Sequence, residues 1–223
     1  EDDVNAPFVD ANGQTNGKTN GEVYKVKPGN SKYVDVNKDG VYNDADQGII
    51  GCGQPTFNWG WNNTFNYKNF DFSFFVVGFH GFDIYNATHQ MGYNLIKSQQ
   101  MAGVTPMREL LNRWTPTNTN TDIPGFVKGG TENKDFFSTR FVENGSFIKM
   151  KSITLGYTLP EATCRSLGIN NLRVYASVQN PFHITKYSGL DPEATMGSPL
   201  VQGVDWGAYP NSRNYLIGLN FSF

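Results

Sequence analysis

Charged residues are scarce in this sequence of 223 residues. They make up 17% of the chain, whereas soluble domains usually contain about 25%. The formal net charge is -2, from 18 lysine and arginine residues against 20 aspartate and glutamate residues. A phosphate backbone requires a stripe of basic side chains, and the sequence has none. Nucleic acid is therefore not expected as a partner.

Long apolar runs are also lacking. No stretch of about 18 apolar residues occurs, so a transmembrane helix is not expected, although a strand of a membrane barrel needs only about 10 alternating residues. The first residues, Glu1 to Asp10, are acidic and lack the basic and then apolar pattern of a signal peptide. We therefore expect the chain to begin within a longer protein or to mature from one.

Cysteine is rare as well. The two cysteines, Cys52 and Cys164, have neither Cys-x-x-Cys spacing nor neighbouring metal ligands, which argues against a zinc or redox site. We expect both to be free thiols.

Aromatic residues and glycine, by contrast, are abundant. Aromatic residues make up 14% of the chain, and there are 24 glycines, a mixture typical of turn-rich β structure. Several segments alternate apolar and polar residues with period two, which predicts strands with one apolar face. Within residues 56–223, strands are predicted at about 57–67, 70–79, 147–159, 171–180 and 213–223.

Two all-β architectures fit these strands. In a β-sandwich the apolar face is buried against a second sheet. In an outer-membrane β-barrel it faces lipid, with aromatic girdles near the strand ends and a polar lumen. The strand at 57–67 carries its aromatic residues on one face and Asn, Gly and Thr on the other. This polar but uncharged second face favours antiparallel strands of a transmembrane barrel, and the sandwich stays open as the alternative.

The connections between the predicted strands differ in length. Residues 68–69 and 160–170 form short connections, whereas 80–145 and 181–212 form long ones. Outer-membrane barrels have short periplasmic turns and long external loops. If this rule applies, strand parity predicts that residues 1–55 form an external loop region.

The segment "DVNKDGVYNDAD", residues 35–46, has the pattern of a twelve-residue calcium loop. Such loops place hard oxygen ligands at alternate positions, with glycine at the sharp turn. The alternative is an Asx-rich turn without a metal. We expect a structural calcium ion that holds the loop in shape. Its predicted ligands are Asp35, Asn37, Asp39, the Val41 carbonyl, Asn43 and Asp46.

No residue pattern predicts an enzyme. The three histidines have no paired spacing, and nothing in the sequence places Asp191 and Glu193 of the "LDPE" motif across a cleft, as glycoside hydrolysis would require. Tyr187, Trp206 and Tyr209 could stack on sugar rings or pack within loops. Substrate-binding residues are not assigned.

Three segments near the end of the chain are "RFVENGSFIKMKSITLGYTLP", "LGINNLRVYASVQNPFHITKYSGLDPE" and "YPNSRNYLIGLNFSF". They resemble the C-terminal part of the SusC/RagA family, TonB-dependent nutrient transporters of the outer membrane of Bacteroidetes. The calcium-type loop and two further upstream segments resemble the family in the same order, so that the resemblance covers about residues 33–223.

The resemblance implies the terminal barrel strands of a transporter that imports oligosaccharides or peptides. Its implied partners are the plug and upstream strands of the same transporter, a SusD-like surface lipoprotein, the TonB complex and outer-membrane lipid. A protein of another class also stays open, namely a secreted calcium-dependent β-sandwich module that binds carbohydrate.

Overall fold

The computed structural model describes residues 5–24, 26–31, 33–93, 106–125, 137–196 and 201–223. The chain divides into two compact units. Unit 1 comprises Glu1–Ile50 and Thr88–Phe141, and unit 2 comprises Gly51–Ala87 and Val142–Phe223. Unit 2 contains the long predicted strands, and unit 1 contains the calcium-type loop.

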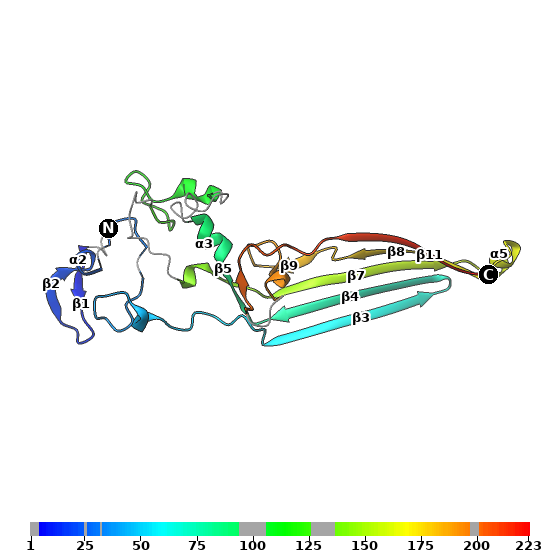
Figure 1. Ribbon diagram of the computed structural model, residues 1–223, viewed down its shortest axis with the longest axis horizontal. Coiled ribbons are helices and arrows are strands. Elements are labelled where there is room, and N and C mark those ends of the chain that lie inside the picture. The colour runs from blue at the N-terminus through cyan, green and yellow to red at the C-terminus, as the bar shows by residue number, and fades with distance from the viewer. Residues whose placement is uncertain (1–4, 25, 32, 94–105, 126–136, 197–200) are drawn as a thin grey trace. The chain divides into compact units, whose positions relative to one another are not determined.

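The main sheet of unit 2 is antiparallel. Its long strands lie side by side in the order β11-β8-β7-β4-β3, and the short strand β9 pairs with β7 (Figure 1). The prediction of an all-β fold built on antiparallel strands is confirmed. The strands are β3 (Phe57–Tyr67), β4 (Phe70–His80), β7 (Phe147–Thr158), β8 (Asn171–Gln179), β9 (His183–Thr185) and β11 (Asn214–Ser222).

The strand register separates the main sheet into an apolar face and a polar face. Residues directly opposite each other in neighbouring strands share a face. One row across the sheet consists of Phe65, Phe72, Leu155, Ala176 and Ile217. The next row, on the other face, consists of Thr64, Ser73, Thr154, Ser177 and Leu216. Many large side chains of the apolar face are exposed in this chain, Ile217 to 81%.

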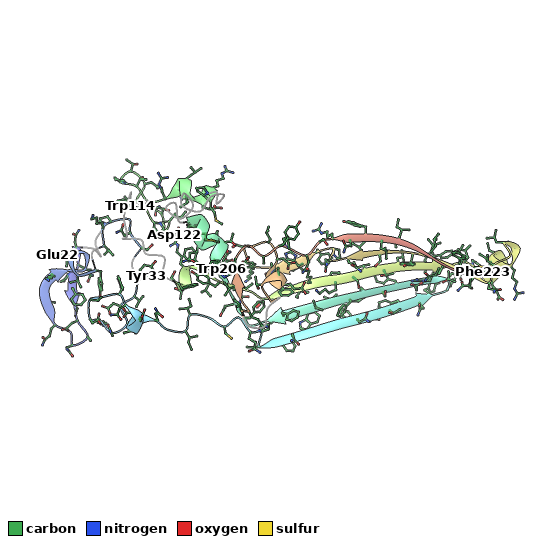
Figure 2. The ribbon with its side chains drawn as sticks, in the orientation of Figure 1. Glu22, Tyr33, Trp114, Asp122, Trp206 and Phe223 are labelled. Carbon is green, nitrogen blue, oxygen red and sulfur yellow. The ribbon has the colours of Figure 1, made fainter. Side chains whose placement is uncertain are left out.

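The two ends of the main sheet differ in their connections. At one end, the Lys68–Asn69 turn joins β3 to β4, and the short helix α5 (Glu161–Ser166) lies between β7 and β8 (Figure 1). Phe223 lies at this same end, whereas Trp206 lies at the other (Figure 2). The long connections leave from that other end, which we call the loop end.

The long connections contain short elements that the sequence pattern did not predict. β5 (Asp83–Asn86), β6 (Val142–Asn144) and β10 (Val204–Asp205) form a second sheet in the order β10-β5-β6. A 3-10 helix, η4 (Pro192–Met196), follows β9. A strand of two to four residues is too short to display a period, so alternation could not identify these elements.

A small apolar core lies at the loop end of the main sheet. Phe82, Ile84, Phe147 and Tyr187 are buried in one cluster, and Phe79 packs against it. The Phe79 and Phe147 rings stack with their centroids 5.1 Å apart. This core attaches the short β5 segment to the main sheet. Cys52 is exposed and Cys164 is buried, and both are free thiols, as expected.

Unit 1 is built from short elements. A hairpin of β1 (Pro7–Val9) and β2 (Thr15–Thr19) leads into the helix α2 (Asn20–Tyr24). Among the described residues, no helix combines the length and the apolar character needed to cross a membrane. The remaining elements of the described residues are α3 (Ala87–Tyr93) and the 3-10 helices η1 (Asp44–Asp46), η2 (Arg108–Asn112) and η3 (Thr139–Phe141).

Candidate functional site

The calcium-type loop of unit 1 is organised around Asp35, its first predicted ligand. Asp35 Oδ1 accepts the N–H of Lys38 at 2.5 Å, and Oδ2 accepts the N–H of Gly40 at 2.8 Å. Gly40 has φ +84, a left-handed conformation that glycine adopts without steric cost. The sharp turn predicted at this glycine is therefore present.

An aromatic side chain from outside the loop, that of Tyr24, supports Asp35. The Tyr24 hydroxyl donates to Asp35 Oδ2 at 3.0 Å, and the Tyr24 ring stacks on Tyr42 with centroids 4.8 Å apart. Phe8 of β1 forms a T-shaped contact with the Tyr24 ring, with the centroids 5.6 Å apart. Burial, together with the hydrogen bond to Asp35, raises the pKa of Tyr24 well above its ordinary value. Tyr24 therefore stays protonated and links the loop to the hairpin.

The remaining predicted ligands are held mainly by hydrogen bonds within the loop. Asp39 Oδ1 accepts the N–H of Val41 at 2.8 Å. Asn37 Oδ1 accepts the N–H of Asp39 at 3.0 Å, and Asn43 Oδ1 accepts the N–H of Ala45 at 2.7 Å. At the last position, the hydrogen bond from the Asn43 N–H is the main cause of the lowered pKa of the Asp46 carboxyl.

The donor set and the turn of this loop suit calcium, which prefers hard oxygen ligands in a flexible geometry. The side chains are nevertheless directed to backbone N–H groups, as in Asx turns. Within the described part of the chain, no three acidic, histidine or cysteine side chains gather as a metal site. The loop is therefore ordered as a turn, and calcium binding would require its carboxylates to rotate toward a common centre.

The polar face of the main sheet carries a charged pair that bridges two strands. Arg173 of β8 donates to Asp71 of β4 through Nε at 2.8 Å and Nη2 at 2.5 Å. The strand between them, β7, has Gly156 at this point, and a Cβ there would lie 2.3 Å from Asp71 Oδ1. Arg173 also lies over the Tyr175 ring at 4.9 Å. The glycine leaves free the space in which the two charged groups meet.

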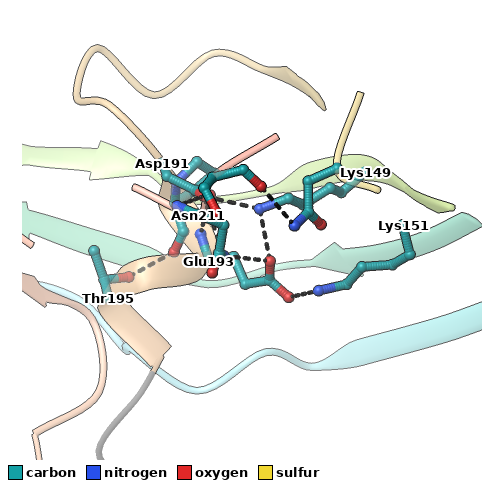
Figure 3. A network of polar contacts seen from close by, with 9 residues as sticks. Lys149, Lys151, Asp191, Glu193, Thr195 and Asn211 are labelled. Atoms are coloured by element: carbon teal, nitrogen blue, oxygen red, sulfur yellow. Dashed lines mark hydrogen bonds and ion pairs between the residues drawn. The ribbon is translucent and has the colours of Figure 1, made fainter. Parts of the chain in front are cut away.

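A second polar cluster lies at the loop end, and we call it the ionic network (Figure 3). Lys149 Nζ of β7 lies 2.8 Å from Asp191 Oδ2 and 2.7 Å from Glu193 Oε2. Lys151 pairs with the other oxygen of Glu193. Asn211 donates its backbone N–H to Asp191 at 3.1 Å and its side-chain amide to Glu193 at 3.0 Å. The Lys149 and Asp191 side chains are each 2% exposed.

Both carboxyl groups of the ionic network stay ionised at neutral pH. Burial raises the pKa of Asp191, but the hydrogen bonds from Lys149 and Asn211 outweigh it and hold the pKa below its ordinary value of 3.8. Burial likewise raises the pKa of Glu193, and Lys149 and Lys151 lower it below 4.5. The network therefore contains two cations and two anions.

The aromatic residues considered for sugar stacking lie in different environments. Tyr187 is buried and donates its hydroxyl to Asp205 Oδ2 at 2.5 Å, so it is a packing residue. Trp206 is 58% exposed and Tyr209 is 90% exposed. The histidines lie on separate elements, His80 on β4, His89 on α3 and His183 on β9.

The sheet defines the class of protein. An antiparallel sheet with one apolar and one polar face, short turns at one end and long loops at the other is part of the wall of an outer-membrane type β-barrel. The open sheet of unit 2 accordingly represents a segment of such a barrel.

Comparisons with known proteins identify the family. No family model matches the chain. It is 36% identical over 202 residues to TonB-dependent receptor P3 of Formosa agariphila, and the match covers 88% of this chain and 19% of the receptor. It is 32% identical over 199 residues to TonB-dependent receptor SusC of Bacteroides thetaiotaomicron, and the match covers 88% of this chain and 18% of SusC. The chain belongs to the SusC/RagA family of TonB-dependent receptors and spans about a fifth of the length of these relatives.

Solved structures agree with this assignment. The RagAB peptide transporter matches with a TM-score of 0.68 and 27% identity, over 82% of this chain and 19% of that chain. The RagAB peptide importer in its closed-closed state matches with a TM-score of 0.67 and 25% identity, over 96% and 20%. The relatives are receptors and transporters, and the expectation that the chain is not an enzyme is confirmed.

Proposed function

We propose that the chain forms part of the barrel wall of an outer-membrane transporter that imports oligosaccharides or peptides. The observation that carries this proposal is the 32% identity to SusC over 88% of the chain. The likeness to RagAB, which is described as a peptide transporter, supports peptides as one cargo class. The chain forms part of the wall that encloses the passage, and no covalent change of the cargo is involved.

The proposed partners follow from the surfaces of the main sheet. Outer-membrane lipid covers the apolar face, and the plug faces the polar one. β3 and β11 are the two edge strands, and an unpaired edge in lipid would leave backbone groups unsatisfied. Upstream strands of the same transporter therefore pair with these edges. A SusD-like surface lipoprotein covers the external loops, and the TonB complex supplies energy from the other side.

The proposed role of calcium is structural. The ion would be held by Asp35, Asn37, Asp39, Asn43 and Asp46 with the Val41 carbonyl, in an external loop region that covers residues 1–55. The contacts of Tyr24 with Asp35 and with Phe8 would transmit the order of the loop to the β1–β2 hairpin. The ion would therefore hold the loop region in shape without contacting the cargo.

Uptake by the organism that encodes the transporter tests the proposed function. Deletion of the full gene should reduce uptake of labelled peptides or labelled oligosaccharides at least tenfold, and an uncoupler should do the same in the parent strain, because TonB-dependent import is energised. Restoring the gene should restore uptake. Unchanged uptake of both cargo classes in the deletion strain would contradict the proposal.

The membrane assignment of the two faces predicts effects of different size at adjacent positions of β11. In the full-length transporter, Ile217→Lys should lower stability by about 2–4 kcal/mol, because a cation near the middle of a strand on the lipid face loses its hydration. Its neighbour Leu216 lies on the polar face, so Leu216→Lys is the matched control and should change stability by less than about 1 kcal/mol.

Heat-modifiable migration of the folded barrel and urea unfolding in lipid vesicles measure this difference. A β-sandwich that bound carbohydrate outside the membrane would fold without lipid or detergent. Equal effects of the two lysines, or a folded full-length protein in detergent-free buffer, would count against the barrel.

A further inference from the structure

We propose that the ionic network locks the connection between β9 and β11 onto the loop end of β7, so that this connection is a fixed part of the barrel mouth and not a moving gate. The locked segment comprises Tyr187–Thr195 and Val201–Asn211. The proposal assigns a role to the "LDPE" motif, which supplies both carboxylates. It goes beyond the proposed transport function, because it specifies which part of the mouth stays still.

The first support is the burial and the charge balance of the network. Lys149 and Asp191 are almost fully buried, and charged groups are buried only when they are paired. Each carboxylate accepts two or more hydrogen bonds, and Asn211 joins both of them. Moving the segment away would leave Lys149 buried without a partner. The position of the segment seen in the structure is therefore strongly favoured over any position that breaks part of the network.

The second support is the change of partner strand at the same place. The part of β7 from Ser152 onward pairs with β8, and the part of β7 from Phe147 to Lys149 pairs with β9. Between these ladders, the Asn180 N–H donates to the Lys151 carbonyl at 2.9 Å, and the Met150 N–H donates to the Phe182 carbonyl at 3.1 Å. Backbone hydrogen bonds thus fix the chain on both sides of the lysines that hold the segment.

The third support is a second attachment of the same segment. Tyr187 donates to Asp205, which also accepts the N–H groups of Gly207 and Ala208 at 2.8 and 2.9 Å. β10 pairs with β5 in parallel, and the Tyr85 N–H donates to the Gly203 carbonyl at 2.7 Å. The segment is therefore held both by the network and by the second sheet. A gate would need at least one free end.

Hydrogen exchange of the full-length transporter in detergent micelles tests the lock. The amides of Glu193 and Asn211 report directly, because both donate to Asp191. In the unmodified protein they should exchange about as slowly as amides of β8. Exchange of these amides at least about a hundredfold faster than that of β8 would overturn the proposal, since a gate opens without unfolding the sheet.

Substitutions within the network should act in a fixed order. Lys149→Met and Asp191→Asn should each speed exchange of the segment by about a hundredfold or more, because in each variant a buried charge loses one of its partners. Lys151→Met should have a smaller effect, since Lys149 still contacts both carboxylates. The double variant Lys149→Met with Asp191→Asn should exchange more slowly than either single variant. An exposed lysine of the same connection supplies the control, Lys186→Met, which should leave exchange unchanged.

Three outcomes would contradict the lock. The first is unchanged exchange in Lys149→Met, and the second is a larger effect of Lys151→Met than of Lys149→Met. The third is a double variant, Lys149→Met with Asp191→Asn, whose exchange is accelerated as much as the two single substitutions together predict. Amides of β4 and β8 are followed in the same experiment, so that unfolding of the whole barrel is recognised.

Acid provides a test without substitution if a variant does not fold. The lowered carboxyl pKa values mean that the network contributes stability above the ordinary values of 3.8 and 4.5 and loses it as the pH falls through the lower folded values. Protection of the segment, corrected for intrinsic exchange, should be constant from about pH 8 to 5 and fall below about pH 4, ahead of β8. Loss of protection near neutral pH would contradict the proposal.

Discussion

Gly203→Ala in the full-length transporter should disrupt the second sheet at the loop end and lower local stability by about 3 kcal/mol or more. Gly203 has φ +76, and a Cβ there would lie 2.5 Å from the Cα of Gly53 and 2.7 Å from the carbonyl oxygen of Asp83. Both contacts are with backbone atoms, which cannot rotate away as a side chain could. The pairing of β10 with β5 should therefore be lost.

Gly168→Ala is the matched control for this substitution. Gly168 has φ +71, and a Cβ there would meet no atom within 4 Å. The Gly168→Ala variant therefore carries the cost of an alanine in the left-handed conformation, about 1–2 kcal/mol, without a steric clash. Hydrogen exchange of the Tyr85 amide, which donates to Gly203, measures the outcome. Equal effects of the two alanines on that amide would show that the close approach of the Gly203 and Gly53 backbones is not needed.

Removal of calcium should expose the segment 35–46 of the full-length protein to protease. In the presence of calcium the segment should resist cleavage. A chelator should increase the cleavage rate about tenfold or more, because carboxylate ligands that no longer share an ion repel each other. Asp35→Ala with Asp39→Ala should be cleaved rapidly in both conditions. Asp44→Ala is the matched control, since Asp44 belongs to the same loop but is not a predicted ligand.

Terbium offers an independent measurement of the same site. The Tyr24 hydroxyl lies 3.0 Å from Asp35, so a terbium ion bound in the loop should luminesce on excitation of tyrosine. Calcium should compete with this emission, and Asp35→Ala with Asp39→Ala should abolish it. If emission is absent and cleavage is the same with and without calcium, the loop is an Asx-stabilised turn and the metal assignment is wrong.

The long strands could be predicted from the sequence because most of them alternate apolar and polar residues along much of their nine to twelve residues. The pattern at Tyr215, Ile217 and Leu219 identifies a strand and also its apolar face, since a strand has a strict period of two. The short strands β5, β6 and β10 could not be found in this way. Their pairing depends on contacts such as that of Val204 with Tyr85, which lie far apart in the sequence.

The ionic network was missed for a similar reason. Lys149 and Asp191 are 42 residues apart, and no local pattern connects them. A signal was nevertheless present, because Lys149 and Lys151 lie in a predicted strand between the apolar residues Phe147 and Ile153. Two lysines in such a strand require anionic partners when they are buried. The sequence placed the "LDPE" carboxylates in the long connection 181–212 and gave them no partner, whereas Asp191 is buried and pairs with Lys149.

The Asp71–Arg173 pair also restricts sliding of β7 between its neighbours. Ladder hydrogen bonds connect adjacent strands only, and they can re-form after a shift of two residues. The side chains of Asp71 and Arg173 meet above β7 at Gly156, where no side chain stands between them. A two-residue slip would bring Thr154 or Thr158 beneath the pair, and the two charged side chains would have to move to accommodate it. A single missing side chain thus favours one alignment of the three strands.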